Sequence, residues 1–438
     1  MTDFHITVEL LKAVRRGDLP HHVVLELSWN HLLHLCPTCR DSVWAFQEEM
    51  QDRPDSAAAV RLLPLVVERH AAEDAKKSQE AERDLRELLE FPHERRLARI
   101  RRANRRFKGL ALVHRLLNEA KRFMPEEPQI LYELAEAAEQ ILLRTLEGSG
   151  YYDALARARA YQANALRARS RLREADERMA SARSLVRREN VTDMLVYAEV
   201  DANEGVLRKD QRRFQQAEEL LTRSVTLFEL AGETVEAARS LVVLGAMYYN
   251  QQEMAKAIET TETALSFLSP ESDPRLYLCA RFNLAKFFVE SGRYGEGDAL
   301  LQADAALYQQ LANPWTVRRQ LWLKGRIALA AGLLEEAERS FLDVRAGFMS
   351  EGIGYDAALV SLDLALLYLR QNRTAAVKEL AEEMREIFAA GDVHREAMAA
   401  LVLFQEAARR ETLTAELIEE MAVCLKQARE NPDLRFAG

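Results

Sequence analysis

The sequence predicts an all-α protein built as an α-solenoid, an array of repeated helix pairs. Length is the first indication, because 438 residues exceed what one ordinary hydrophobic core holds together. Composition is the second: 48% of residues are hydrophobic and 29% charged, with only 17 Gly and 11 Pro, and Ala, Leu, Glu and Arg are abundant. The third is a short pattern that returns about every 40 residues.

The amino-terminal segment contains a candidate metal site in HLLHLCPTCR, residues 31–40. Two cysteines separated by two residues at the start of a helix are a common half-site for zinc, which thiolates and imidazoles bind tetrahedrally. The candidate ligands are Cys36, Cys39, His31 and His34. A thioredoxin-like redox pair needs a βαβ setting, and no strand pattern surrounds these residues.

This arrangement resembles the zinc-binding domain of bacterial anti-sigma factors over about residues 8–52. That family has His-x-x-x-Cys-x-x-Cys, whereas leucine stands four residues before Cys36 here. The first of the two histidines then serves if the helix end unwinds, or the second replaces it, and His21 or His22 supplies the fourth ligand. The alternative is a degenerate site that keeps the fold without the metal, with the cysteines as small core residues.

A charged helical linker is expected over residues 66–106, after an amino-terminal module of residues 1–65. ERRLARIRRANRRFKG carries a dense basic cluster, which includes Arg95, Arg99 and Arg102 on one helical face. Such a cluster suits phosphates or an acidic partner, or it pairs with the acid-rich segment just before it. Net charge −9 and the lack of a recognised reading motif argue against nucleic acid.

A small or slender residue marks the same place in six consecutive repeats. These residues are Ala175, Ala217, Ala257, Gly297, Ala337 and Val377, at spacings of 42, 40, 40, 40 and 40. Twelve residues before them stand Ala163, Gly205, Gly245, Ala285, Gly325 and Ala365. Small residues at matched positions let two helices approach closely, so each repeat is predicted to be an antiparallel helix pair touching through these positions.

The segment LVVLGAMYYNQQEMAKAIETTETAL, residues 241–265, resembles the tetratricopeptide repeat (TPR). The resemblance covers residues 155–390 well, and more weakly residues 107–125, which look like a lone second helix. It implies a right-handed solenoid over residues 107–390, with the first helix of each pair lining a concave groove. The period of about 40 exceeds the usual 34, which longer helices and loops explain.

Basic and amide groups outnumber acids among the first-helix residues that the TPR pattern directs toward the groove. They are Arg157, Asn164, Arg167, Lys209, Arg239, Lys286, Arg319, Trp322, Arg326 and Arg370. A groove of this kind favours an acidic or carboxylate-ended segment of a protein or peptide, because arginine binds carboxylates bidentately. The alternative is that these side chains are solvated and paired with nearby Glu.

Residues 391–438 break the repeat and predict two amphipathic helices that cap the last pair. Cys424 lies between Met421 and Leu425 on the second of them, and is expected in the core.

The remaining patterns narrow the class of protein. No Gly-rich phosphate loop, Gly-x-Ser-x-Gly elbow or His-Glu-x-x-His helix is present, so we expect no enzyme. No secretion signal or membrane-spanning run is found, and few cysteines suit a reducing compartment, so a cytoplasmic protein is expected.

Two functional hypotheses follow. The first is an interaction scaffold whose anti-sigma-like module sequesters a sigma factor under control of the TPR groove. The second is an adaptor or inhibitory subunit of a bacterial signalling or defence complex, with a protease or kinase partner bound in that groove.

Overall fold

The structure is a computed structural model, and it describes residues 75–430 apart from short gaps at 104–105, 125–126, 146–149, 188–190, 192, 312, 390–403, 406 and 409–411. All regular structure in these residues is helical, which confirms the predicted fold class. The chain divides into two compact units. Unit 1 contains residues up to Leu207 together with Leu230–Gly232, and unit 2 contains Arg208–Glu229 and the residues from Glu233 onward.

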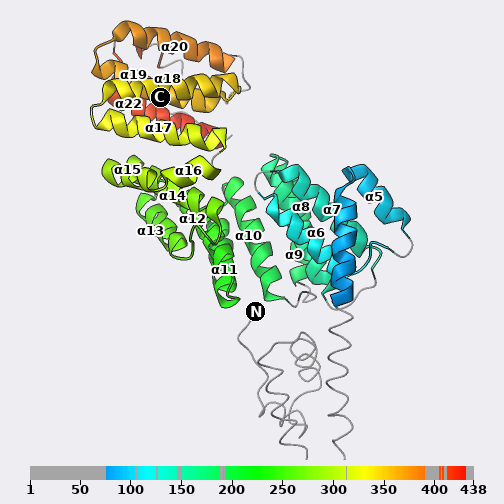
Figure 1. The fold of residues 1–438 in the computed structure, drawn as a ribbon. Coiled ribbons are helices and arrows are strands. Elements are labelled where there is room, and N and C mark those ends of the chain that lie inside the picture. The colour runs from blue at the N-terminus through cyan, green and yellow to red at the C-terminus, as the bar shows by residue number, and fades with distance from the viewer. Residues whose placement is uncertain are drawn as a thin grey trace, which may run out of the picture. The chain divides into compact units, whose positions relative to one another are not determined.

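Unit 1 is a layered set of antiparallel helices (Figure 1). It comprises a helix over residues 75–89, α5 (His93–Arg102), α6 (Leu110–Arg122), α7 (Pro128–Leu142), α8 (Tyr151–Ala168), α9 (Leu172–Arg187) and most of α10 (Met194–Asp210). One continuous apolar core joins these helices. The segment 107–125, expected as a lone second helix, contains α6, which packs on α7 and α8 and so opens a helix pair of its own.

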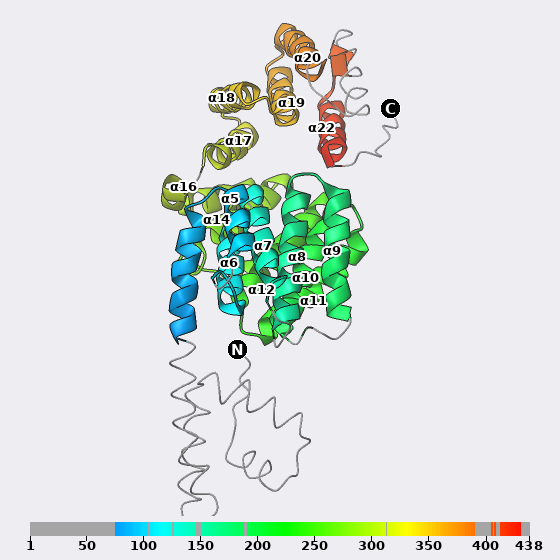
Figure 2. The ribbon, with the colours of Figure 1, turned by 90° about the vertical axis from the view of Figure 1, so that its right-hand side faces the viewer.

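Unit 2 continues the helix pairs (Figure 2). It comprises the last residues of α10, nearly all of α11 (Phe214–Leu230), α12 (Thr234–Asn250), α13 (Met254–Ser266), α14 (Pro274–Glu290), α15 (Tyr294–Ala303), α16 (Ala305–Leu311), α17 (Pro314–Ala330), α18 (Leu334–Ser350), α19 (Gly354–Arg370), α20 (Thr374–Ala389) and α22 (Ala415–Glu430). The six repeats seen in the sequence begin at α8, α10, α12, α14, α17 and α19, with α15 and α16 sharing one second-helix position.

The turn inside each pair uses the same left-handed residue. Positive φ angles of 55° to 78° occur at Ser170, Arg212, Gln252, Gly292, Gly332 and Asn372, five residues before each small second-helix residue. The next amide donates back to a carbonyl five residues earlier, as Glu253 N does to Tyr248 O at 2.9 Å. This is the Schellman ending of a helix, so every first helix of the six repeats stops in the same way.

Where both helices of a pair lie in one unit, the paired small residues hold them together as the sequence predicts. All twelve are buried. A Cβ at Gly245 would lie 3.3 Å from Ala257 O, and one at Gly297 would lie 3.1 Å from Ala285 O, so each glycine lies directly on the backbone of its partner helix. A larger side chain at these positions has no room unless the helices separate.

The basic cluster of the linker pairs within the chain. Arg99 lies 2.5 Å from Glu87, and Arg106 lies 2.6 Å from Asp84 and 2.7 Å from Glu87, joining the basic segment to the helix over residues 75–89. Arg96 is buried and donates to the carbonyl of Leu88 at 3.0 Å. Of the two alternatives that the sequence left open for this cluster, these contacts support intramolecular pairing.

Helix α22 packs against α19, within the apolar core of the last repeats. Ile418, Met421 and Leu425 have exposed fractions of 2%, 0% and 0%, and Cys424 is buried beside them. Figure 2 shows α22 running alongside α19.

Within the described part of the chain, no helix is both long and apolar enough to cross a membrane.

Candidate functional site

A groove of about 800 Å³ lies within unit 2. The first helices α14, α17 and α19 line its floor, and residues at the end of α12 and on one side of α22 also line it. Residues of α17 that line the groove recur at helical spacing, at positions 315, 319, 322, 326 and 329. We call this surface the groove. Its charged lining residues are Arg212, Lys286, Arg319, Arg326, Arg370, Lys426, Glu290, Asp356, Asp363 and Glu419.

Aromatic rings and cations lie together at the α12–α14–α17 end of the groove. Lys286 Nζ lies 3.7 Å from the centre of the Tyr249 ring, and the guanidinium of Arg319 lies 5.0 Å from the centre of the Phe282 ring. The Trp315 ring also lines this end, with its centre 6.0 Å from the same guanidinium. Cations above aromatic faces are held in place, so this end of the groove combines positioned cations with an apolar base.

A compact ion network forms the floor between α14, α17, α19 and α22. Arg326 Nη1 lies 2.6 Å from Glu290 Oε1, and Arg326 Nε lies 3.8 Å from Asp363 Oδ1. Trp322 Nε1 donates to Asp363 Oδ2 at 2.6 Å. Lys426 Nζ, from α22, lies 3.0 Å and 3.3 Å from the two carboxylate oxygens of Glu290. The two acids are thereby matched by two cations, one of which comes from outside the repeats.

The environment shifts the pKa values of the two floor carboxylates, Glu290 and Asp363, in opposite directions. Burial alone would raise the pKa of Glu290, but the nearby Arg326 and Lys426 cations outweigh it and lower that pKa to about 2. Burial raises the pKa of Asp363, against the opposing effects of Arg326 and the Trp322 hydrogen bond. Glu290 therefore stays ionised as the anchor of both cations.

The structure brings several of the predicted groove residues together. Lys286, Arg319, Trp322, Arg326 and Arg370 all line the groove of unit 2. Their side chains are held by contacts with the protein, as with Arg370 Nη1, which donates to the carbonyl of Leu329 at 3.1 Å. The groove is thus a preformed surface rather than a row of fully solvated charges.

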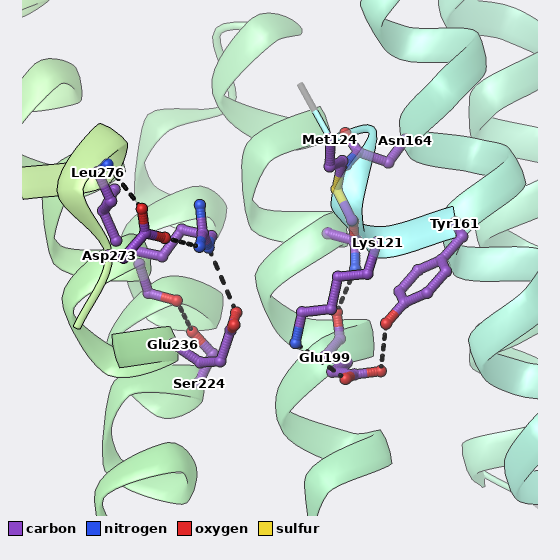
Figure 3. Close-up of polar contacts among 12 residues, drawn as sticks. Lys121, Met124, Tyr161, Asn164, Glu199, Ser224, Glu236, Asp273 and Leu276 are labelled. Carbon is purple, nitrogen blue, oxygen red and sulfur yellow. Dashed lines mark hydrogen bonds and ion pairs between the residues drawn. The ribbon is translucent and has the colours of Figure 1, made fainter. Parts of the chain in front are cut away.

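The predicted residues of α8 lie in unit 1, in a polar cluster with α6 and α10, and Figure 3 shows Asn164, Lys121 and Glu199 of this cluster. Arg157 makes two bonds to Glu199, with Nε to Oε2 at 2.7 Å and Nη2 to Oε1 at 3.0 Å. Asn164 donates to the sulfur of Met124, and Arg167 Nε donates to Asn164 Oδ1 at 2.8 Å. These side chains join neighbouring first helices to one another.

The other two predicted cations lie near acids at helix ends. Lys209 Nζ lies 2.6 Å from Asp210 Oδ1. Arg239 Nη2 lies 2.9 Å from Asp273 Oδ2, and Figure 3 shows Asp273 also accepting from the amide of Leu276 at the start of α14. That second contact is an N-cap, so Arg239 binds the residue that begins the next first helix.

The predicted zinc ligands Cys36, Cys39, His31 and His34 lie outside the described residues. In the described ranges, no group of three or more His, Cys, Asp or Glu side chains is arranged to hold a metal ion. Zinc binding stays a prediction from the sequence.

Sequence reasoning missed several groove residues that the repeat register locates. Phe282 and Leu362 line the groove 40 residues before and after the predicted Trp322, and Leu366 lines it 40 residues after the predicted Arg326. Extending the repeat alignment from the small residues to every first-helix column would have found them. Lys426 carries no such signal, because α22 lies beyond the last repeat.

No family model matches this sequence, and no curated protein matches it. Solved structures do resemble the fold. A Rap protein complexed with competence and sporulation factor is 15% identical over 73% of this chain and 87% of its own, with a TM-score of 0.56. The apo form of RapI is 13% identical over 71% of this chain and 85% of its own, with a TM-score of 0.54.

A third similar structure is a signal transduction ATPase with numerous domains (STAND) that has a tetratricopeptide repeat sensor, from Pyrococcus horikoshii. It is 14% identical over 72% of this chain and 46% of its own, with a TM-score of 0.53. These likenesses support the TPR-like helical repeat that the sequence predicts.

Proposed function

We propose that this chain is a non-enzymatic regulatory protein that binds a carboxylate-bearing segment of a peptide or partner protein in the groove. The observation that carries the proposal is the juxtaposition of Lys286 and Arg319 with the Tyr249, Phe282 and Trp315 rings on one preformed concave surface. Aromatic faces bind apolar side chains, and the cations bind carboxylates. The solved Rap protein complexed with competence and sporulation factor supports this class of activity for the fold.

We expect binding to depend on charge and to map to the groove. The probe is an octapeptide of alternating Glu and Leu with a fluorescent label, and its matched control has Gln in place of every Glu. Fluorescence anisotropy should show tighter binding of the Glu peptide, weakened by added salt, because exposed charges are screened. Arg319→Ala should weaken binding about tenfold, the loss expected for one charge-assisted hydrogen bond.

Arg339→Ala is the matched control variant, since Arg339 is exposed on the second helix α18 and does not line the groove. Equal binding of the Glu and Gln peptides, or equal weakening by the two arginine variants, would show that the groove is not the site that binds carboxylates.

The partner proposed from the amino-terminal resemblance is a sigma factor, held by residues 1–65 with zinc on Cys36 and Cys39. The full chain should retain a sigma factor from extracts of its native host, identified by mass spectrometry, and bind zinc measurably by metal analysis. The full chain carrying Cys36→Ser and Cys39→Ser should lose both, because zinc-site folding depends on its thiolate ligands. Retention of the same non-sigma partner by both chains would favour the adaptor or inhibitory-subunit alternative.

A further inference from the structure

Helix α22 is part of the groove although it lies outside the repeat. Its residues Ile418, Ala422 and Val423 line the groove on one face, next to Lys426. Val423 is 42% exposed, and the Lys426 side chain is 35% exposed, whereas Met421 and Leu425 of the same helix are fully buried. One side of α22 therefore packs in the core, and the other side lines the groove that a ligand would enter.

The geometry of Lys426 permits a second anionic partner. An ammonium group carries three N–H donors, and its recorded bonds in this structure run to the two oxygens of one carboxylate, Glu290. Glu290 does not depend on Lys426 alone, because Arg326 lies 2.6 Å from its Oε1. A carboxylate entering the groove can share Lys426 without leaving Glu290 buried and unpaired.

We propose that Lys426 is a ligand-binding residue of the groove, and that a carboxylate ligand therefore holds α22 to the repeat array. The proposal rests on the proposed function and names a residue through which the ligand is recognised. The coupling follows from linkage: if docked α22 contributes a contact to the ligand, then the ligand stabilises the docked helix by the same factor.

The test uses the full chain, the Glu/Leu octapeptide, four new variants and the Arg319→Ala variant already described. Lys426→Met should lower peptide affinity about tenfold, and Lys426→Arg should keep it near that of the unaltered chain. Lys324→Met, on an exposed lysine of α17 that does not line the groove, should have no effect. In the unaltered chain, saturating peptide should slow hydrogen exchange of amides 415–426, and Lys426→Met should abolish that slowing.

Glu290→Gln separates ligand binding from a purely structural role of the ion pair. It removes the partner of Lys426 but keeps the lysine, so peptide affinity should hold or rise under the proposal. If Glu290→Gln weakens binding as much as Lys426→Met does, the ion pair acts only by holding α22 in place, and the proposal is wrong.

Two further results overturn it in distinguishable ways. If Lys426→Met binds the peptide like the unaltered chain while Arg319→Ala binds it weakly, the groove function stands and this inference falls. If the unaltered chain does not bind the Glu peptide at all, the proposed function and this inference fall together.

Discussion

Leucine in place of Gly245 is expected to destabilise the helix array of unit 2 by about 1–3 kcal/mol, the cost of overpacking a close contact. A Cβ at this position would overlap the hydroxyl of Thr261 and lie 3.3 Å from Ala257 O. Thr261 is buried, and its hydroxyl already donates to Ala257 O at 2.7 Å, so it has no alternative position that keeps the bond. Denaturant unfolding followed by circular dichroism measures the loss.

Gly295→Leu provides a matched control for this prediction. Gly295 also lies within a helix, α15, but no heavy atom other than those of its chain neighbours and its own helix backbone lies within 4 Å of where its Cβ would be. Leucine there should be neutral or stabilising by up to about 1 kcal/mol, because glycine is a poor helix former. Equal midpoints for the two variants would show that Gly245 is not a close helix contact and that the repeat alignment is misplaced.

The repeat could be predicted because its defining positions depend on size. A close approach between two helices tolerates Gly or Ala and little else, so Gly245 and Ala257 carry a signal that survives in a single sequence. The left-handed turn residue five positions earlier carries a weaker signal. Glycine occupies only two of its six occurrences, because Ser170, Gln252 and others accept that conformation at modest cost.

The groove could be predicted only in part, because the sequence shows where a charged residue lies on a helix but not which residue it pairs with. Arg157 and Arg326 both occupy first helices, yet Arg157 lies in a buried pair with Glu199 in unit 1 while Arg326 lines the groove of unit 2. Glu199 is 42 residues from Arg157, one repeat away, so the pairing depends on which first helices touch. Lys426 was not predicted as a groove residue at all, because its position depends on how α22 packs against α19.

The Arg157–Glu199 pair leads to the largest stability effect that we expect. Glu199 is 7% exposed, and it accepts bonds from Arg157 and, at 3.1 Å, from the hydroxyl of Tyr161. Lys121 lies 3.5 Å from it (Figure 3). Burial raises the pKa of Tyr161 to about 12, so that hydroxyl remains a donor at neutral pH. Glu199→Ala removes the shared acceptor and leaves a buried guanidinium without its counterion, which costs about 3–5 kcal/mol.

The pH dependence of this loss has a definite sign. Burial favours a higher pKa for Glu199, but Arg157 and Lys121 outweigh it and hold the pKa below its usual range. A carboxylate with a lowered folded-state pKa stabilises the protein fully above its unfolded pKa of about 4.3, and the contribution is lost as the pH falls toward the folded value. As the pH falls below about 4.3, the free energy of unfolding of the unaltered chain should therefore decrease more than that of Glu199→Ala.

Hydrogen exchange of the α8 and α10 amides, measured at increasing denaturant concentration, reports the stability of unit 1. It should show the loss of stability in Glu199→Ala at pH 7 and a smaller loss in acid. Glu174→Ala removes one partner of an exposed pair at the start of neighbouring α9 and should change stability far less, since solvent already screens that pair. Replacing Arg157 and Glu199 together by methionine should recover much of the single-variant loss, because the cost arises from one unpaired buried charge rather than from a missing attraction. If the double variant is as unstable as Glu199→Ala, packing rather than charge explains the effect, and the electrostatic account of this cluster is wrong.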